Sequence, residues 1–332
     1  MLAKGLAWGM LALLLGVWSD AACAVQAESI ARLVHEKRHA EAQRAIQARL
    51  ARDAADPVAL AAMVDLRIAQ GSPDDLPQAR AVAERCVAVH PDSSVCAEAL
   101  ANVLAAQSRT GSVFTLVFNA RATRDALERA LRFDPMNYRA RVSLLRFYLQ
   151  TPFFLGGNEA RARELATEAR HTDPDLTRLT RAMCSLYEGK LDDAEQHILA
   201  ADLRQYLLVQ DEQRTLLLTL ANAHLDAGRH ARSARLFEEL GLRLPSSEDG
   251  PYGLALVARA QGRLAEAAVQ FEKAAAIAPR PHVYKALGEV REALHDRPRA
   301  IAAYEAALAG VPPLARRERG QVAAQLAQLR RQ

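Results

Sequence analysis

The sequence predicts an all-α protein, a right-handed superhelical solenoid of antiparallel helix hairpins with a capping helix at its C-terminal end. The first reason is composition, because 68 of the 332 residues are alanine, the strongest helix former, and only 5% are aromatic. The second reason is a period, since prolines that end helical patterns recur after 34 and 33 residues in the second half of the chain. A period of this length fits one helix hairpin and indicates stacked repeats.

Each period carries the same set of packing residues. An aromatic residue stands eight positions before each proline, and a small residue follows the turn between two helical patterns. Small residues let two helices approach closely, the aromatic fills the gap to the next hairpin, and proline stops the second helix because it has no N–H to donate. The prolines are Pro245, Pro279 and Pro312, the aromatics are Phe237, Phe271 and Tyr304, and the small residues are Ser233, Ala267 and Ala300.

This pattern resembles the tetratricopeptide repeat, and the aromatic stretch at 147–157 is similar to a segment of exported bacterial proteins of that family. The resemblance implies about eight repeats within residues 28–314, which begin near residues 28, 57, 94, 138, 177, 214, 248 and 281. A basic C-terminal capping helix, residues 315–332, is expected to follow them. Its amphipathic part from Gln321 would cover the open apolar face of the last repeat with Val322, Leu326 and Leu329.

The charge distribution argues against a nucleic-acid partner. The formal net charge is +4, and residues 315–332 hold five arginines and one glutamate, so the whole excess lies in this segment. The rest of the chain is balanced and lacks the surplus of positive charge that neutralises phosphates.

The N-terminal residues have the pattern of an export signal. Lys4 precedes an apolar stretch at residues 5–18, and Ala22-Cys23-Ala24 is a small-x-small cleavage site. We expect residues 1–24 to be a signal peptide that is cleaved after Ala24, with Ala27 as the second choice. Fourteen apolar residues are short for a bilayer span, although retention as an anchor remains the alternative. The predicted location is the periplasm, with no stable membrane span after cleavage.

Three cysteines remain after this cleavage. An exported chain meets an oxidising compartment, and the repeat frame places Cys86 and Cys96 on neighbouring helices that approach closely. They form either a disulfide or two buried free thiols, because the sequence does not show the distance between their side chains. Cys184 occupies a helix-packing position and is expected in the core.

A five-residue segment matches the zincin pattern His-Glu-x-x-His through His35, Glu36 and His39. This pattern makes a zinc-dependent hydrolase the alternative function. The chemistry requires both histidines on one uninterrupted helix, whereas the repeat frame places Lys37 and Arg38 in a turn. We therefore predict no enzyme, no catalytic residue and no cofactor or metal.

Stacked hairpins place the first helix of every repeat on the concave side, so its exposed residues line a groove. Four arginines and two asparagines fall at such positions, and fixed guanidinium groups suit carboxylates. The expected partner is a protein or an acidic peptide segment. In the alternative reading, the arginines pair with Glu128, Glu164 or Asp175 and form a solvated face. The predicted groove residues are Asn102, Arg139, Arg146, Arg178, Arg181 and Asn222.

Aromatic residues are unevenly distributed, with eight of the 15 phenylalanines and tyrosines between residues 114 and 154. Phe114 and Phe118 belong to an insert at 108–119, which the repeat frame places in a turn between helices. The insert is too apolar for a solvated loop. We expect it to pack over neighbouring hairpins, with a contact site for a partner as the alternative.

Together these observations predict an exported scaffold or adaptor. It would bind a protein or peptide partner in its concave groove and support a complex of the cell envelope.

Overall fold

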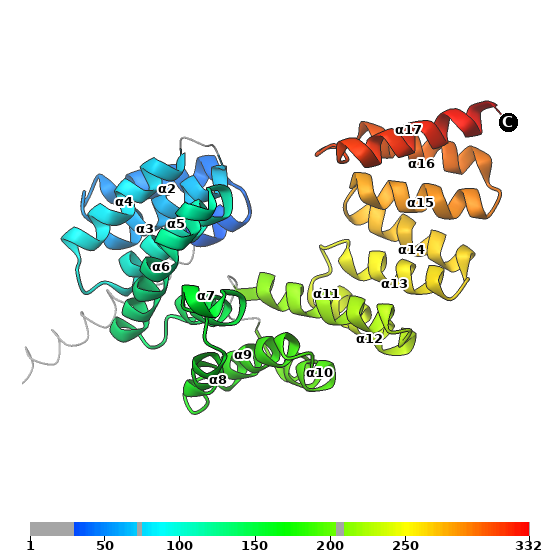
Figure 1. The fold of residues 1–332 in the computed structure, drawn as a ribbon. Coiled ribbons are helices and arrows are strands. Elements are labelled where there is room, and N and C mark those ends of the chain that lie inside the picture. The colour runs from blue at the N-terminus through cyan, green and yellow to red at the C-terminus, as the bar shows by residue number, and fades with distance from the viewer. Residues whose placement is uncertain (1–29, 72–74, 204–208, 332) are drawn as a thin grey trace, which may run out of the picture. The chain divides into compact units, whose positions relative to one another are not determined.

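The computed structural model describes residues 30–71, 75–203 and 209–331 (Figure 1). The described residues form helices and turns and contain no strand, which confirms the predicted all-α class. The predicted signal peptide, residues 1–24, lies outside the described residues. The chain divides into two compact units, the first comprising Met1–Tyr187 with Ala200–Gln210 and the second Glu188–Leu199 with Asp211–Gln332.

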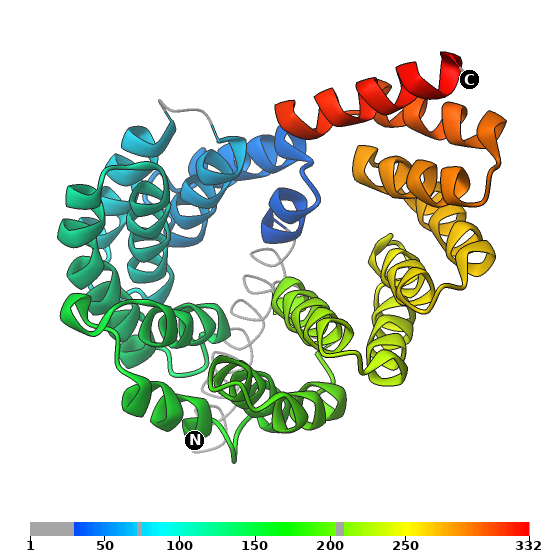
Figure 2. The same ribbon diagram turned by 45° about the vertical axis from the view of Figure 1, so that its right-hand side comes forward.

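In the first unit, helices that follow one another in the chain are joined by short turns and pack against each other (Figure 2). Its helix N-termini are fixed by side-chain caps: Asp56, Ser93 and Asn137 each accept a hydrogen bond from a backbone N–H in the first turn. The helices are α2 (His39–Leu50), α3 (Pro57–Gln70), α4 (Asp75–Val89), α5 (Ser94–Thr110), α6 (Val113–Phe133), α7 (Tyr138–Gln150), α8 (Glu159–Glu168) and α9 (Pro174–Tyr187), with the 3₁₀ turn η1 (Phe153–Leu155).

The second unit continues this hairpin pattern, and the aromatic residues of the period are its core. Phe237, Phe271 and Tyr304 are at most 2% exposed, and the small residues that follow each turn are fully buried. A Cβ atom on Gly253 would lie 1.9 Å from the Phe237 ring, so the glycine makes room for the aromatic. The helices are α10 (Leu191–Ala200), α11 (Gln210–Asp226), α12 (His230–Arg243), α13 (Asp249–Ala260), α14 (Leu264–Ile277), α15 (Pro281–Ala293), α16 (Arg297–Ala309) and α17 (Arg316–Arg331).

The turn within a hairpin requires a left-handed backbone. Gly228 and Gly262 supply it with φ angles of 71° and 75°, and His295 adopts the same conformation with a φ of 59° at the equivalent place. The turn geometry is therefore kept even where the repeat lacks glycine.

The capping helix α17 lies within residues 315–332, where the sequence places it. Val322, Leu326 and Leu329 of α17 are buried against Ala300, Tyr304 and Ala307 of α16. The helix begins at Arg316, five residues before its amphipathic part, and Glu318 in its first turn accepts a hydrogen bond from the Lys285 ammonium at 2.8 Å. This acidic residue favours the helix N-terminus, so the helix begins ahead of its apolar pattern.

Cys86 and Cys96 form a disulfide between α4 and α5, with their Cα atoms 5.3 Å apart. Both are fully buried beside Leu60, so the bond lies inside the hairpin junction. Cys184 is buried as a free thiol on α9. None of the helices in the described ranges is both long and apolar enough to cross a membrane.

Candidate functional site

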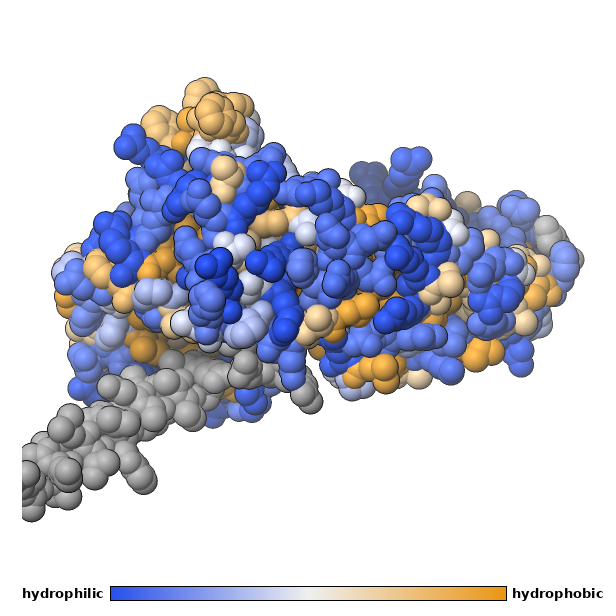
Figure 3. Space-filling view, turned by 90° about the horizontal axis from the view of Figure 1, so that it is seen from below, coloured by the Kyte–Doolittle hydropathy of each residue, from blue (hydrophilic) through white to orange (hydrophobic). Residues whose placement is uncertain are grey.

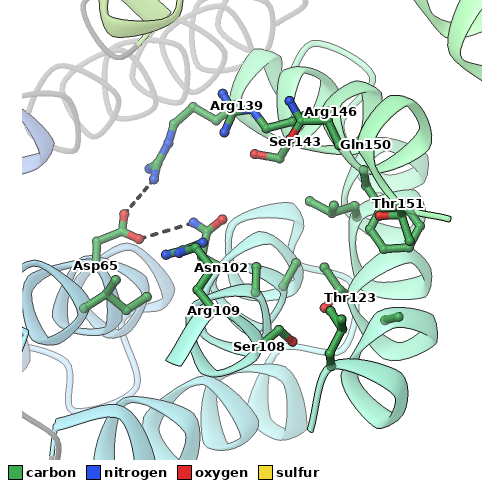
Figure 4. A pocket seen from close by; sticks show the side chains of 17 residues that line it. Asp65, Asn102, Ser108, Arg109, Thr123, Arg139, Ser143, Arg146, Gln150 and Thr151 are labelled. Carbon is green, nitrogen blue, oxygen red and sulfur yellow. Dashed lines mark hydrogen bonds and ion pairs between the residues drawn. The ribbon is translucent and has the colours of Figure 1, made fainter. Parts of the chain in front are cut away.

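A cavity of about 610 Å³ lies in the first unit, between α3, α5, α6 and α7 (Figure 4). The three helices α3, α5 and α7 contribute polar residues, and Leu116, Ala120 and Leu127 of α6 form an apolar wall. Such a volume lies in the range of sites that bind small molecules or peptide side chains.

The cavity brings together three of the six residues predicted to form the groove. Asn102 of α5 and Arg139 and Arg146 of α7 line it. Arg178 and Arg181 lie on α9 and are not among its lining residues, and Asn222 belongs to α11 in the second unit. Arg178 donates a hydrogen bond to Asp175 at 2.6 Å, a pairing that the alternative of a solvated face predicted. The cavity therefore contains only those predicted groove residues that lie on α5 and α7.

Arg139 is held by two carboxylates of the chain itself, and Figure 4 shows its contact with one of them, Asp65. Its Nη2 lies 2.8 Å from Oδ2 of Asp65, and its Nε lies 3.0 Å from Oε1 of Glu98, whose side chain is 7% exposed. Asn137 donates to the other oxygen of Glu98 at 2.9 Å. Burial by itself would lower the pKa of Arg139, but the charges of Asp65 and Glu98 outweigh it and raise this pKa.

The sequence predicted Arg139 as a groove residue for an acidic partner, and the structure places its guanidinium in ion pairs with carboxylates of its own chain. The group is already paired, because packing brings Asp65 of α3 and Glu98 of α5 against it. Arg139 joins three helices and shapes the wall of the cavity.

The remaining cationic residues at the cavity are Arg109 and Arg146, both exposed. Arg109 is not among the predicted groove residues, although it follows Asn102 by seven residues and thus lies on the same face of α5. Three arginines and one aspartate line the cavity, and their net charge together with that of Glu98 is +1. An anion is thus favoured in the cavity.

The His-Glu-x-x-His segment is not one helix. The helical residues 30–35 end at His35, Lys37 has a left-handed φ of 59°, and a new helix starts at His39. The Glu36 carboxylate accepts a hydrogen bond from Arg38 at 3.1 Å. The two histidines therefore lack the shared helical face that the zincin reading requires.

The expectation that the aromatic insert packs over neighbouring hairpins is wrong for its phenylalanines. Phe114 and Phe118 are 76% and 79% exposed, and Phe153 and Phe154 of η1 are 87% and 81% exposed. The reason is that residues 113–119 of the insert are the first part of the long helix α6. Its other face contacts α5, where Asn119 donates to the Leu104 carbonyl. In the space-filling view, hydrophilic residues cover most of the face shown and hydrophobic ones gather in a protruding group (Figure 3).

No protein-family model matches the chain, and no curated protein matches it. Among solved structures, the chain is similar to yeast Tom70, with a TM-score of 0.58 and 16% identity over 89% of this chain and 59% of that chain. A tetratricopeptide repeat protein from Parabacteroides merdae matches with a TM-score of 0.39 and 15% identity over 92% of this chain and 98% of that one. Cut9-Hcn1 of the APC/C hetero-tetramer matches with a TM-score of 0.46 and 14% identity over 88% and 52%.

The chain thus spans about three fifths of the length of Tom70, and at this identity the similarity is one of fold. The hairpins, the buried aromatics of the period and the capping helix agree with it. The chain has a tetratricopeptide-like fold.

Proposed function

We propose that the protein is an exported scaffold or adaptor that binds an acidic segment of a protein partner in the cavity of its first unit, in support of a cell-envelope complex. The observation that carries this proposal is the position of Arg109 and Arg146 at one cavity that Leu116, Ala120 and Leu127 of α6 also line with apolar side chains. An acidic side chain would meet the guanidinium groups while a neighbouring apolar side chain packs on Leu116 and Leu127.

The internal pairing of Arg139 supports this assignment. Arg139 offsets one of the two negative charges of Asp65 and Glu98, and Arg109 and Arg146 then leave the cavity with one net positive charge, which favours an incoming acidic group. Asn102 donates to Asp65 at 3.3 Å and is part of the same network. The anion would therefore bind near Arg109 and Arg146, and the rest of the network keeps the wall in place.

Replacing Arg109 or Arg146 by glutamine is expected to weaken the binding of an acidic peptide by about 1 to 3 kcal/mol each, the range of charge-assisted hydrogen bonds. The probe is a labelled peptide of aspartate, glutamate, leucine and alanine, followed by fluorescence anisotropy. A second peptide carries asparagine and glutamine in place of the acidic residues. Binding should fall with added salt, because exposed charges are screened over about 8 Å at physiological ionic strength.

Arg121→Gln is the matched control, because Arg121 lies on α6, is 83% exposed and does not line the cavity. It should bind the acidic peptide like the unchanged chain. If Arg109→Gln and Arg146→Gln bind like this control while Phe114→Ser and Phe118→Ser abolish binding, the aromatic face is the recognition surface. Equal affinity for the acidic and the amide peptide would also contradict the proposal.

Export is supported by the signal pattern at residues 1–24, and the Cys86–Cys96 bond suits an oxidising compartment. Protein recovered from the periplasm of a bacterial host is expected to have the mass of a chain that begins at Val25, or at Glu28 with the second cleavage site. Reduction should add the mass of two hydrogens, because one disulfide opens. Intact-mass spectrometry before and after reduction tests both points. Retention of Met1 would contradict cleavage of the signal, and an unchanged mass after reduction would contradict the disulfide.

A further inference from the structure

A cluster of potential metal ligands lies in the second unit, away from the proposed peptide site. Asp192 and Glu195 are three residues apart on α10 and so share a helix face, and His224 lies near the end of α11. One ligand atom from each of the three side chains lies within 4.8 Å of the others.

Two of these side chains, Glu195 and His224, are buried and have polar atoms without a hydrogen-bond partner. His224 is 0% exposed and the Glu195 side chain is 9% exposed, with Nε2 and Oε2 only 3.1 Å apart. Their alignment does not make a hydrogen bond, and Glu195 Oε2 and both ring nitrogens of His224 have no hydrogen-bond partner in the described structure. Buried polar atoms are ordinarily satisfied, so each such group requires an explanation.

We propose that Asp192, Glu195 and His224 bind a zinc ion that links α10 to α11. An imidazole nitrogen with two carboxylate oxygens is a ligand set that zinc accepts, whereas calcium and magnesium favour oxygen ligands alone. The ion would satisfy the imidazole and the buried carboxylate at once. Three protein ligands leave the fourth position of a tetrahedral zinc for water, and the exposure of Asp192 gives access to it.

Arg232 competes with the ion for this site. Its guanidinium donates a hydrogen bond to Asp192, its Nε lies 4.0 Å from Glu195 Oε2, and Arg229 lies 3.8 Å from Asp192. Zinc must displace the contact between Arg232 and Asp192. The two side chains are 45% and 66% exposed, so Arg232 has room to turn into solvent. The arginine therefore lowers the affinity of the site, and its removal should increase that affinity.

The test is a zinc titration of the full chain, purified without a histidine tag and treated with a chelator, in competition with a chromophoric zinc indicator. We expect one zinc per chain at this site, and Asp192→Asn should weaken binding by about tenfold or more. Arg232→Gln should tighten it severalfold, because a competing cation is removed. Zinc should raise the melting temperature of the unchanged chain and not that of Asp192→Asn.

Asp193→Asn is the matched control. Asp193 is the exposed neighbour of Asp192 on the same helix, and its substitution removes the same charge. It should retain the affinity of the unchanged chain. Asp192 is exposed, so its replacement leaves the packing of the unit intact, and circular dichroism verifies this. The proposal is overturned if no zinc binds, if Asp192→Asn binds zinc like Asp193→Asn, or if Arg232→Gln binds zinc more weakly than the unchanged chain.

Discussion

Replacement of Phe271 by alanine is expected to lower the free energy of unfolding by about 3 to 5 kcal/mol, the range for a phenylalanine removed from a core. The ring is 0% exposed and packs between α13, α14 and α15. Tyr252 contacts it edge to face, with the ring centroids 5.4 Å apart. Its other neighbours include Ala255, Ala258 and Ala267, whose short side chains cannot move into the space that the ring leaves.

The effect should be large for a second reason. Each hairpin of a repeat array contacts only its neighbours, so the loss of one interface is not compensated by contacts elsewhere. Urea denaturation followed by circular dichroism measures the change. Leu242→Ala on α12 is the control, because this leucine is 78% exposed and its loss should change the free energy of unfolding by less than about 0.5 kcal/mol. Equal effects of the two substitutions would show that Phe271 is not the packing element of its repeat.

The fold could be predicted from the sequence because the packing of a repeat array is local. Phe237, Phe271 and Tyr304 recur with the period, and a residue buried between two hairpins recurs wherever a hairpin recurs. The turn at His295 shows the limit of such a signature, since the backbone keeps its left-handed conformation without glycine. The first turn of α17 carries charged residues, so the apolar pattern of this helix starts only at Val322.

The candidate site could be predicted only in part. The spacing of residues assigns a side chain to a helix face, but it does not show which distant residue that side chain contacts. The positions of Asn102, Arg139 and Arg146 on inward faces follow from the repeat frame. The pairing of Arg139 with Asp65 depends on a residue 74 positions earlier in the chain, so no local pattern contains it. The cluster of Asp192, Glu195 and His224 likewise combines two helices that the sequence does not show to be in contact.

Replacement of Arg139 by methionine is expected to lower the free energy of unfolding by about 2 to 4 kcal/mol. Removing one partner of a buried ion pair leaves the other charge uncompensated, and this loss reaches about 3 to 5 kcal/mol when both partners are fully buried. Arg139 is 31% exposed, which reduces the value, but the Glu98 side chain is 7% exposed and keeps only its contacts with amide groups. Asp65, 20% exposed, also loses its charged partner.

The charge on Glu98 can be tested as the cause by a second substitution. The double variant Arg139→Met with Glu98→Gln lacks the buried carboxylate of Glu98, so it should be more stable than Arg139→Met alone. Arg146→Met is the control, because Arg146 is exposed on the same helix and should change the stability by less than about 0.5 kcal/mol. If the double variant is less stable than Arg139→Met, the uncompensated charge of Glu98 is not the reason for the loss.

The same variants separate the two kinds of arginine at the cavity. Arg146→Met should lose affinity for the acidic peptide and keep its stability, because Arg146 lines the cavity and is exposed. The double variant of Arg139 and Glu98 should keep most of the affinity if its fold is retained, since Arg139 is engaged with carboxylates of its own chain. A loss of binding in that double variant equal to the loss in Arg146→Met would place Arg139 in direct contact with the partner.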